Sequence, residues 1–267
     1  MARKTRKQYR SVWVSDVHLG TSACKAEELT DFLGRIECEQ LYLVGDIVDG
    51  WRIQANFHWP QSHTNVVRKL LSKSRDGTKV IYVTGNHDEF LRKFSDYRLK
   101  FGNIRIVDEA VHTTADGRRL LVIHGDQFDV VTRYHRWLAL AGDKAYDFVV
   151  WANAHVNRYR RRRGQAYWSL AAFLKHKVKT AVSFISEYER ALAHECRRRG
   201  LDGVICGHIH HPEIRPVDGV TYHNCGDWVE SCTALAEHPD GRIEILRWRS
   251  AAVRPSTSTP FVLSVAA

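Results

Sequence analysis

Five short, largely apolar segments of this chain each run into a polar residue, and this pattern constrains the fold most. The segments span residues 11–15, 41–44, 80–84, 120–123 and 203–206. Apolar runs of four or five residues without alternation indicate strands that are buried on both faces. Helical patterns at 25–37 and about 63–74 lie between the first three segments. Strand, helix and strand in succession predict a layered α/β fold.

The polar residues that follow these strands form five short motifs. They are Asp16-Val17-His18, Gly45-Asp46-Ile47-Val48-Asp49, Gly85-Asn86-His87-Asp88, His124-Gly125-Asp126 and Gly207-His208-Ile209-His210. Any one of them occurs by chance, and a lone histidine is more often structural than a ligand. Ligands of α/β sheets bind beyond the carboxyl ends of the strands, where all five motifs lie. Together they predict a metal site at one edge of the sheet.

The residue types in these motifs favour particular ions. Imidazole and carboxylate ligands together suit Mn, Fe, Zn or Co better than Mg or Ca. Residues i and i+2 of an extended segment point the same way, so Asp16 with His18, and His208 with His210, are expected to project in pairs. A carboxylate such as Asp46 can bridge two cations about 3.5–4 Å apart. We therefore predict two divalent metal ions per chain, with Mn preferred.

The region 129–199 differs from the rest, because it reads as mostly helical and rich in aromatic residues. We expect a helical insertion, or lid, between two core strands. After it, residues 223–227, 231–236 and 242–248 are expected to form antiparallel strands, with a turn at Pro239-Asp240-Gly241. The sequence thus predicts a single domain over residues 1–249 and a disordered tail over 250–267, which is rich in Ala, Ser, Thr and Pro.

The charge balance is 40 Lys+Arg against 30 Asp+Glu, a formal net charge of +10. This favours anionic partners such as phosphate esters, nucleic acid or an acidic membrane surface, but net charge also serves solubility alone. The six cysteines form no Cys-x-x-Cys pair, and the basic N-terminus lacks the apolar segment of a signal peptide. No apolar run approaches the roughly 20 residues that span a bilayer. We expect a cytoplasmic protein with reduced thiols.

In order and spacing style, the five motifs resemble those of the calcineurin-like metallophosphoesterase superfamily, over residues 16–210. The resemblance implies a four-layer αββα sandwich of two mixed sheets and a metal-dependent phosphohydrolase. It also implies two ligand sets that share Asp46. One set is Asp16, His18, Asp46 and His210, and the other is Asp46, Asn86, His124 and His208.

Two further residues have roles implied by the same resemblance. His87 resembles the histidine that stabilises the transition state or protonates the leaving oxygen. Asp49 resembles its carboxylate partner, which would orient the imidazole and favour its protonated form. The alternative for Asp49 is an aspartate that only stabilises a turn. Trp51 follows two residues after Asp49, and we expect its side chain either to form a wall of the site or to pack in the core.

Within the superfamily, the chain is similar to the UDP-2,3-diacylglucosamine hydrolases of lipid A synthesis. The similarity rests on Ser15-Asp16-Val17-His18-Leu19-Gly20, Asp49-Gly50-Trp51, Gly226-Asp227-Trp228 before Glu230, and the helical insertion. It implies hydrolysis of the pyrophosphate to UMP and 2,3-diacylglucosamine 1-phosphate. Those enzymes typically have Gly-Asn-Arg-Asp where this chain has Gly85-Asn86-His87-Asp88. A sister branch acting on another nucleotide-linked, phospholipid or soluble phosphoester is therefore the alternative.

The insertion carries candidate substrate-binding residues, namely Arg158, Arg161, Arg162, Lys175 and Trp168. They form either an anion-binding rim, with peripheral association at an anionic membrane surface, or a solvated face with aromatic core residues. Nucleic acid is disfavoured as a partner, because the chain lacks a helix-turn-helix signature and aromatic-basic interleaving. The intact ligand set argues against a scaffold without catalytic activity. The oligomeric state and the metal identity stay open.

Overall fold

A computed structural model describes residues 6–95, 100–101, 103–128 and 170–248 of the chain. Its strands form two sheets, with the orders β12-β11-β1-β2-β3-β5-β4 and β6-β7-β8-β10-β9. The first sheet contains β1 (Lys7–Val14), β2 (Ile36–Val44), β3 (Lys79–Val83), β4 (Lys100–Phe101), β5 (Ile104–Val107), β11 (Thr233–Glu237) and β12 (Ile243–Arg247). The second sheet contains β6 (Glu109–Thr113), β7 (Arg119–Ile123), β8 (Gly203–Cys206), β9 (Glu213–Val217) and β10 (Val220–Asn224).

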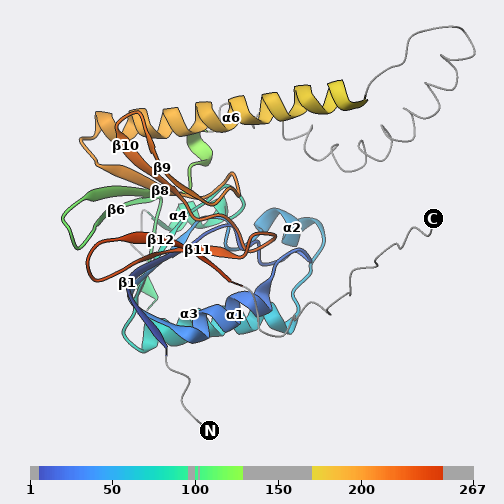
Figure 1. Cartoon of the computed structure of the whole chain (residues 1–267). Coiled ribbons are helices and arrows are strands. Elements are labelled where there is room, and N and C mark those ends of the chain that lie inside the picture. Colours follow the sequence, from blue (N-terminus) through green and yellow to red (C-terminus); the bar gives the residue numbers. More distant parts are fainter. Residues whose placement is uncertain (1–5, 96–99, 102, 129–169, 249–267) are drawn as a thin grey trace, which may run out of the picture.

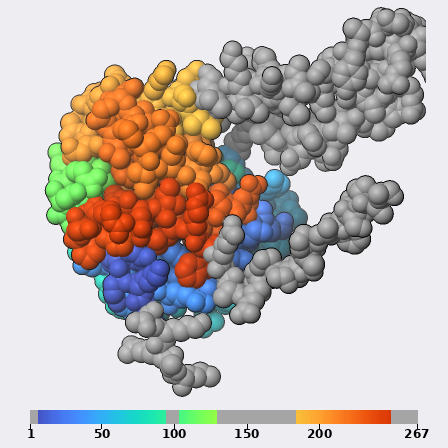
Figure 2. All heavy atoms as spheres, viewed as in Figure 1, coloured from blue at the N-terminus to red at the C-terminus, as the bar shows by residue number. Residues whose placement is uncertain are grey.

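Helices cover the outer face of each sheet (Figure 1). On the first sheet lie α1 (Ala26–Arg35) and α3 (Gln61–Arg75), and on the second lies α6 (Leu170–Arg198). The short helices α2 (Gly50–Ala55) and α4 (Arg92–Ser95) follow β2 and β3. In the space-filling view, the red residues of β11 and β12 lie between the orange second sheet and the blue N-terminal strand (Figure 2). The predicted αββα sandwich of two mixed sheets is confirmed.

Three buried apolar clusters fill the three interfaces between the four layers. Strand β1 shows how one strand serves two of them, because alternate residues face opposite sides of a sheet. Val12 and Val14 belong to the cluster under α1 and α3, whereas Trp13 belongs to the cluster between the sheets. All three side chains are fully buried. This explains why the core strands read as continuous apolar runs.

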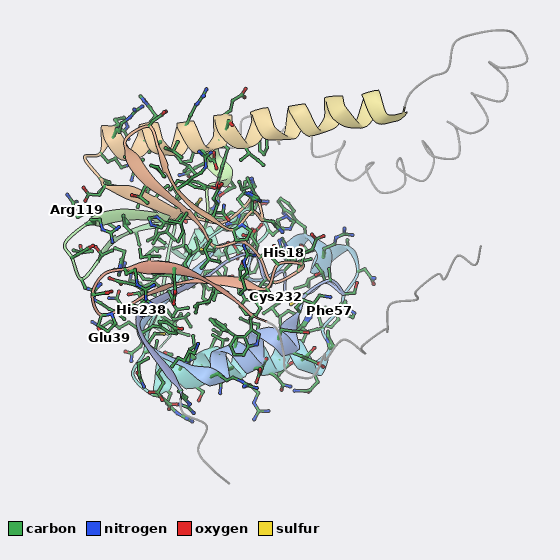
Figure 3. All side chains as sticks on the ribbon, in the orientation of Figure 1. His18, Glu39, Phe57, Arg119, Cys232 and His238 are labelled. Atoms are coloured by element: carbon green, nitrogen blue, oxygen red, sulfur yellow. The ribbon has the colours of Figure 1, made fainter. Side chains whose placement is uncertain are left out.

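The parallel strands all direct their carboxyl ends to one end of the sandwich. In the first sheet β1, β2, β3 and β5 are parallel, and in the second β7, β8 and β10 are parallel. Figure 3 shows Arg119, at the start of β7, at the left edge of the molecule, and His18, just past the end of β1, well to its right on the side of Phe57. The five motifs therefore meet where the two sheets end together.

The structure corrects part of the sequence prediction. Segment 223–227 was expected to pair antiparallel with its successors, but β10 lies in the second sheet, parallel to β8 and antiparallel to β9. The antiparallel pair β11–β12 with its intervening turn is confirmed. Strands β4, β5, β6 and β9 were not predicted. Helix α6 begins at Leu170, within the region expected to form a helical insertion, whereas residues 129–169 and the tail from 249 lie outside the described residues.

Candidate metal centre

An unusual backbone conformation positions most of the candidate ligands. Five of them have positive φ: Asp16 (52°), His18 (53°), Asp46 (54°), His208 (71°) and His210 (53°). Non-glycine residues adopt this left-handed conformation rarely, and such strained residues gather at functional sites. The extended geometry expected for the two i, i+2 pairs is therefore wrong.

Hydrogen bonds between neighbouring loops hold this conformation in place. The loop after β1 runs alongside the loop after β2. Asp16 N donates to Gly45 O at 3.1 Å, and Val17 N donates to Asp46 O at 3.0 Å. Leu19 N donates to Ile47 O at 2.9 Å. The backbone of each of these two ligand-bearing loops thus stabilises the conformation of the other.

The side chains converge in two groups whose ligand atoms lie within 4.8 Å of one another: Asp16, His18 and His210 in one, and Asp46, His124 and His208 in the other. In the first group, Nε2 of His210 lies 3.2 Å from Oδ1 of Asp16. In the second, Nε2 of His124 lies 3.3 Å from Oδ2 of Asp46. The same Asp46 oxygen is 3.9 Å from Nε2 of His18, so it lies between the two groups.

Each carboxylate accepts hydrogen bonds from backbone N–H or hydroxyl groups with one oxygen and turns the other oxygen toward the imidazoles. Oδ2 of Asp16 accepts hydrogen bonds from the Ser15 hydroxyl and, at 3.0 Å, from His208 N. Oδ1 of Asp46 accepts from His87 N at 2.8 Å. The remaining oxygens, Oδ1 of Asp16 and Oδ2 of Asp46, are the ones that face the imidazoles.

In His124 and His18, Nδ1 contacts a protein group and Nε2 has no hydrogen-bond partner. Nδ1 of His124 donates to Val44 O at 3.0 Å, which leaves the lone pair on Nε2. Among the seven candidate ligands, four buried atoms have no hydrogen-bond partner: Asp16 Oδ1, His18 Nε2, Asn86 Oδ1 and His124 Nε2. Such unpartnered atoms are rare in proteins, and this mixed nitrogen and oxygen set suits divalent transition-metal ions. The residues present therefore fit a two-metal centre.

The buried carboxylates and imidazoles of the site shift one another's pKa. Burial alone would raise the pKa of Asp16, but the rings of His210, His124 and His18 outweigh it and hold that pKa below its usual range. Burial likewise opposes ionisation of Asp46, and His124 lowers its pKa. Conversely, burial would lower the pKa of His124, but the carboxylates of Asp46 and Asp16 raise it. The buried carboxylates thus favour positive charge on the neighbouring imidazoles.

Asp49 and His87 lie beside the two groups. Oδ2 of Asp49 is 3.0 Å from Nδ1 of His87 and 3.2 Å from Nδ1 of His18. Oδ1 of Asp49 accepts from Arg52 N at 2.9 Å and so caps α2. Asp49 therefore stabilises a turn and also contacts both histidines. The Trp51 ring lies 4.1 Å from the His87 ring, between centroids, which places Trp51 against the site.

One carboxylate inside the third motif was missed by sequence reasoning. Asp88 is fully buried and accepts hydrogen bonds from Ile47 N at 2.9 Å and from the Tyr82 hydroxyl at 2.6 Å. It also accepts from Gly85 N, so it joins the loop of Asp46 to the loop of Asn86. Burial and the neighbouring Asp46 charge raise its pKa. Its position directly after His87 was the available signal.

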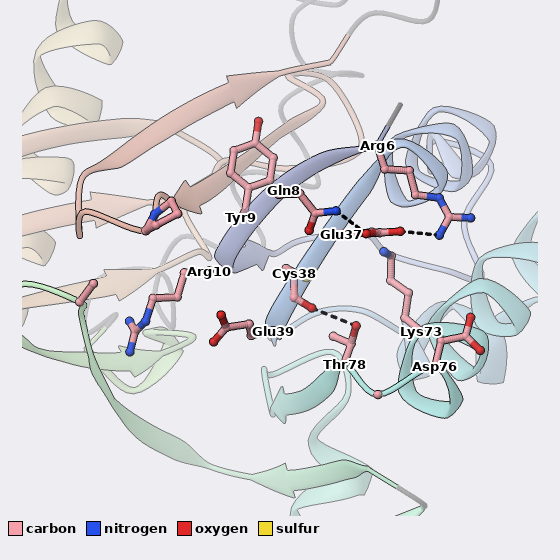
Figure 4. A pocket seen from close by; sticks show the side chains of 13 residues that line it. Arg6, Gln8, Tyr9, Arg10, Glu37, Cys38, Glu39, Lys73, Asp76 and Thr78 are labelled. Carbon is pink, nitrogen blue, oxygen red and sulfur yellow. Dashed lines mark hydrogen bonds and ion pairs between the residues drawn. The ribbon is translucent and has the colours of Figure 1, made fainter. Parts of the chain in front are cut away.

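The proposed substrate-binding residues are not brought to the site by the described structure. Arg158, Arg161, Arg162 and Trp168 lie outside the described residues, and for Lys175 the structure gives only the α6 backbone. A hollow of about 570 Å³ lies elsewhere, at the start of β1 and β2 (Figure 4). Two cationic side chains that line this hollow already have partners in the protein. Arg6 forms an ion pair with Glu37 at 3.0 Å, and Lys73 donates a hydrogen bond to Ile36 O at 2.8 Å. None of the seven candidate ligands lines it.

The glycine before Asn86 provides a test of the packing at the centre. A Cβ at Gly85 would overlap Oδ1 of Asp46 and lie 2.6 Å from Asp46 N. We expect Gly85→Ala to displace the Asp46 loop, to destabilise the protein by about 1–3 kcal/mol and to lower the bound Mn below two ions per chain. Elemental analysis after Mn reconstitution and the thermal midpoint measure both effects. Gly34→Ala on α1, where the nearest atoms are 3.6 Å away on Lys69, is the control. Two retained Mn ions in Gly85→Ala would contradict the expectation.

Comparisons with known proteins agree with this geometry. The family model of the calcineurin-like phosphoesterases matches residues 9–212. A UDP-2,3-diacylglucosamine hydrolase of Neisseria meningitidis serogroup B is 24% identical, over 81% of this chain and 88% of its own. A protein of the same name from Stenotrophomonas maltophilia is 26% identical, over 84% of this chain and 93% of its own.

Among solved structures, the chain is similar to a Vps29 single mutant of Entamoeba histolytica, with a TM-score of 0.43 and 14% identity over 89% of this chain and 97% of that one. None of the helices in residues 6–95, 100–101, 103–128 and 170–248 is long and apolar enough to cross a membrane.

The match of the family model covers most of the chain and includes every candidate ligand. The chain belongs to the calcineurin-like phosphoesterase family and is a metal-dependent phosphohydrolase.

Proposed function

We propose that this enzyme hydrolyses UDP-2,3-diacylglucosamine to UMP and 2,3-diacylglucosamine 1-phosphate, with two divalent metal ions and a preference for Mn. Relatives with that name match over four fifths of the chain, which supports the substrate. The observation that carries the reaction class is the position of Asp46 Oδ2 between two groups of ligand atoms. Such an arrangement serves the displacement of a leaving group from phosphorus.

The proposed roles are those that the family resemblance implies, and the two groups of ligand atoms support them. Asp16, His18, Asp46 and His210 hold one ion, and Asp46, Asn86, His124 and His208 hold the other. Two bound ions would activate a water molecule and neutralise the charge that develops on phosphoryl oxygens. His87 lies at the edge, with its Nε2 3.9 Å from Asp46 Oδ2, and stabilises the transition state or protonates the leaving oxygen. Asp49 orients the His87 ring.

A second candidate function is favoured by one observation. His87 occupies the motif position where the named lipid hydrolases typically carry arginine, and its ring is held between Asp49 and Trp51. A protonatable imidazole suits general acid catalysis in a way that an arginine does not. The alternative is therefore a metallophosphodiesterase that acts on another nucleotide-linked, phospholipid or soluble phosphoester.

A substrate panel with Mn separates the two functions. The panel holds UDP-2,3-diacylglucosamine, a nitrophenyl phosphodiester and a nitrophenyl phosphomonoester. The first proposal requires UMP release from the lipid with a kcat/KM at least about 100-fold above that for the diester, a gap of about 2.7 kcal/mol. Efficient turnover of the diester with none of the lipid would exclude it and support the second.

For the insertion, we propose that Arg158, Arg161, Arg162, Lys175 and Trp168 contact the substrate or an anionic membrane surface on the cytoplasmic side. Each basic residue near such a surface contributes roughly 1 kcal/mol of attraction. Sedimentation with phosphatidylglycerol vesicles, compared with phosphatidylcholine vesicles, tests this for the chain and for a triple Arg→Gln variant. Equal sedimentation of the two proteins with both vesicles would refute the membrane contact.

His87 can be tested apart from the metal ions. We expect His87→Ala to retain two Mn ions per chain and to lose about 100-fold in kcat, the lower range for a lost general acid. A group that must be protonated limits activity on the alkaline side of the pH–rate profile. That limb should disappear in His87→Ala and persist in His194→Ala, which changes an exposed histidine of α6. If the limb is unchanged in His87→Ala, then His87 acts as an electrostatic stabiliser and not as the acid.

A further inference from the structure

Tyr188 of α6 contacts the backbone of two ligand-bearing loops. Its side chain is buried, with 2% exposure. Its hydroxyl donates toward His124 O at 3.3 Å and toward Gly207 O at 3.4 Å. A phenol has one proton to donate, so the two carbonyls share it. The hydroxyl thus lies between the end of β7 and the end of β8, where each strand passes into a candidate ligand.

Gly125 and His208 pack closely against Tyr188. Gly125, directly after His124, has φ +108°, and a Cβ there would overlap the Tyr188 hydroxyl. The Tyr188 ring lies 6.0 Å from the His208 ring, between centroids, at an interplanar angle of 39°. One side chain therefore meets both histidines of the Asp46, His124 and His208 group, through the carbonyl of one and the ring of the other.

Further hydrogen bonds tie the same two loops together. Gly207 N donates to His124 O at 3.2 Å, and Asn224 Nδ2 donates to Gly207 O at 2.8 Å. These contacts come from the sheet itself, whereas Tyr188 comes from the helix that covers it. Three other buried residues of α6, Leu192, Ala193 and Cys196, belong with Tyr188 to one apolar cluster, whereas the buried Glu189 pairs with Arg215. The hydroxyl adds polar contacts that apolar packing does not require.

We propose that Tyr188 is a positioning residue that couples α6 to the metal position formed by Asp46, His124 and His208. Helix α6 begins at Leu170 and its N-terminal half extends beyond the second sheet (Figure 1). A shift of the helix would move the hydroxyl and, with it, the carbonyl of His124 and the carbonyl of Gly207, which directly precedes His208. Partners behind the ligands of a metal typically change its affinity about 10–100-fold when they are removed. The inference rests on the two-metal centre and holds for any phosphoester substrate.

The test is the stepwise binding of Mn to the metal-free full chain and to Tyr188→Phe. We expect one of the two dissociation constants to rise about tenfold and the other to stay within twofold. Electron paramagnetic resonance at two equivalents of Mn should show less of the exchange-coupled pair and more of the isolated ion. Both readouts are independent of turnover. Failure of the substrate proposal would therefore leave this result intact.

Two comparisons make the outcome decisive. Tyr42→Phe removes the hydroxyl of another buried tyrosine, which lies 3.1 Å from His112 and contacts none of the candidate ligands that the structure describes. It should leave both Mn affinities unchanged. Equal losses in Tyr42→Phe and Tyr188→Phe would show a general loss of stability and overturn the proposal. Unchanged affinities in Tyr188→Phe would overturn it as well, even if Tyr188→Leu, which removes the ring, binds Mn poorly.

Discussion

Asp46→Asn is expected to bind fewer than two Mn ions per chain and to lose at least about 10⁴-fold in kcat, or roughly 5.5 kcal/mol of transition-state stabilisation. Asp46 Oδ2 lies 3.3 Å from His124 Nε2 and 3.9 Å from His18 Nε2, while Oδ1 accepts from His87 N. An amide keeps one oxygen and cannot fill both roles. Either the shared ligand or the hydrogen bond to His87 is lost, and the negative charge is lost in both cases.

Elemental analysis, steady-state kinetics and thermal unfolding with and without Mn measure this effect. A ligand that binds only the folded chain raises its stability, so the wild-type midpoint should increase with Mn. Asp46→Asn should show a much smaller increase. Asp31→Asn, which changes a partly exposed partner of Arg35 on α1, should behave as wild type. An Asp46→Asn protein with two Mn ions and more than a tenth of the wild-type rate would contradict the proposed shared ligand.

The second large effect is expected at the other end of the sandwich, where Glu237→Ala should lower the free energy of unfolding by about 3–5 kcal/mol. Glu237 of β11 is fully buried between the sheets. Its Oε1 accepts from Arg10 at 2.6 Å and from Ala115 N at 2.8 Å, and its Oε2 lies 2.9 Å from Nε2 of His112. Removing the carboxylate leaves the buried His112, the half-buried Arg10 and the Ala115 N–H without this partner.

The contribution of Glu237 should depend on pH. Burial opposes its ionisation, but His112 and the Ala115 N–H hold its pKa below the ordinary value of 4.5. A carboxyl group with a lowered folded-state pKa stabilises the protein above its unfolded pKa and loses that contribution as the pH falls. The difference between the wild type and Glu237→Ala should therefore be largest near neutrality and shrink below about pH 4.5.

Urea unfolding at pH 7 and at lower pH measures both differences. Glu244→Ala removes a half-exposed carboxylate that pairs with His238 and Arg242, so it should change the free energy of unfolding by less than about 1 kcal/mol. A similar small effect in Glu237→Ala, constant over pH, would show that the buried cluster contributes little.

The sequence was sufficient to predict the end of the sandwich where the site lies. Continuous apolar runs mark parallel strands, and the carboxyl ends of parallel strands meet, so Asp16, Asp46 and His124 had to lie near one another. The ligand sets depended on resemblance, because spacing alone does not tell which side chains share an ion. His208 and His210 illustrate this, since they are two residues apart but belong to different groups.

Other features left no readable signal. Edge strands β6 and β9 carry polar residues and, in β9, Pro216, which are typical of edges and weaken a strand pattern. The left-handed backbone at Asp16 and His18 was invisible, because neither residue type requires it. Tyr188 lies 64 residues from His124 along the chain, and helical periodicity does not single out one polar contact.

The candidate ligands come from loops of both sheets, and this has a consequence for local opening of the fold. Asp16, His18, Asp46 and Asn86 follow strands of the first sheet, whereas His124, His208 and His210 follow strands of the second. Bound ions would therefore join the two sheets at one end, while Glu237 and His112 join them at the other. Chelation would release only the first junction, so amide hydrogen exchange should quicken in the ligand loops and stay slow in β11.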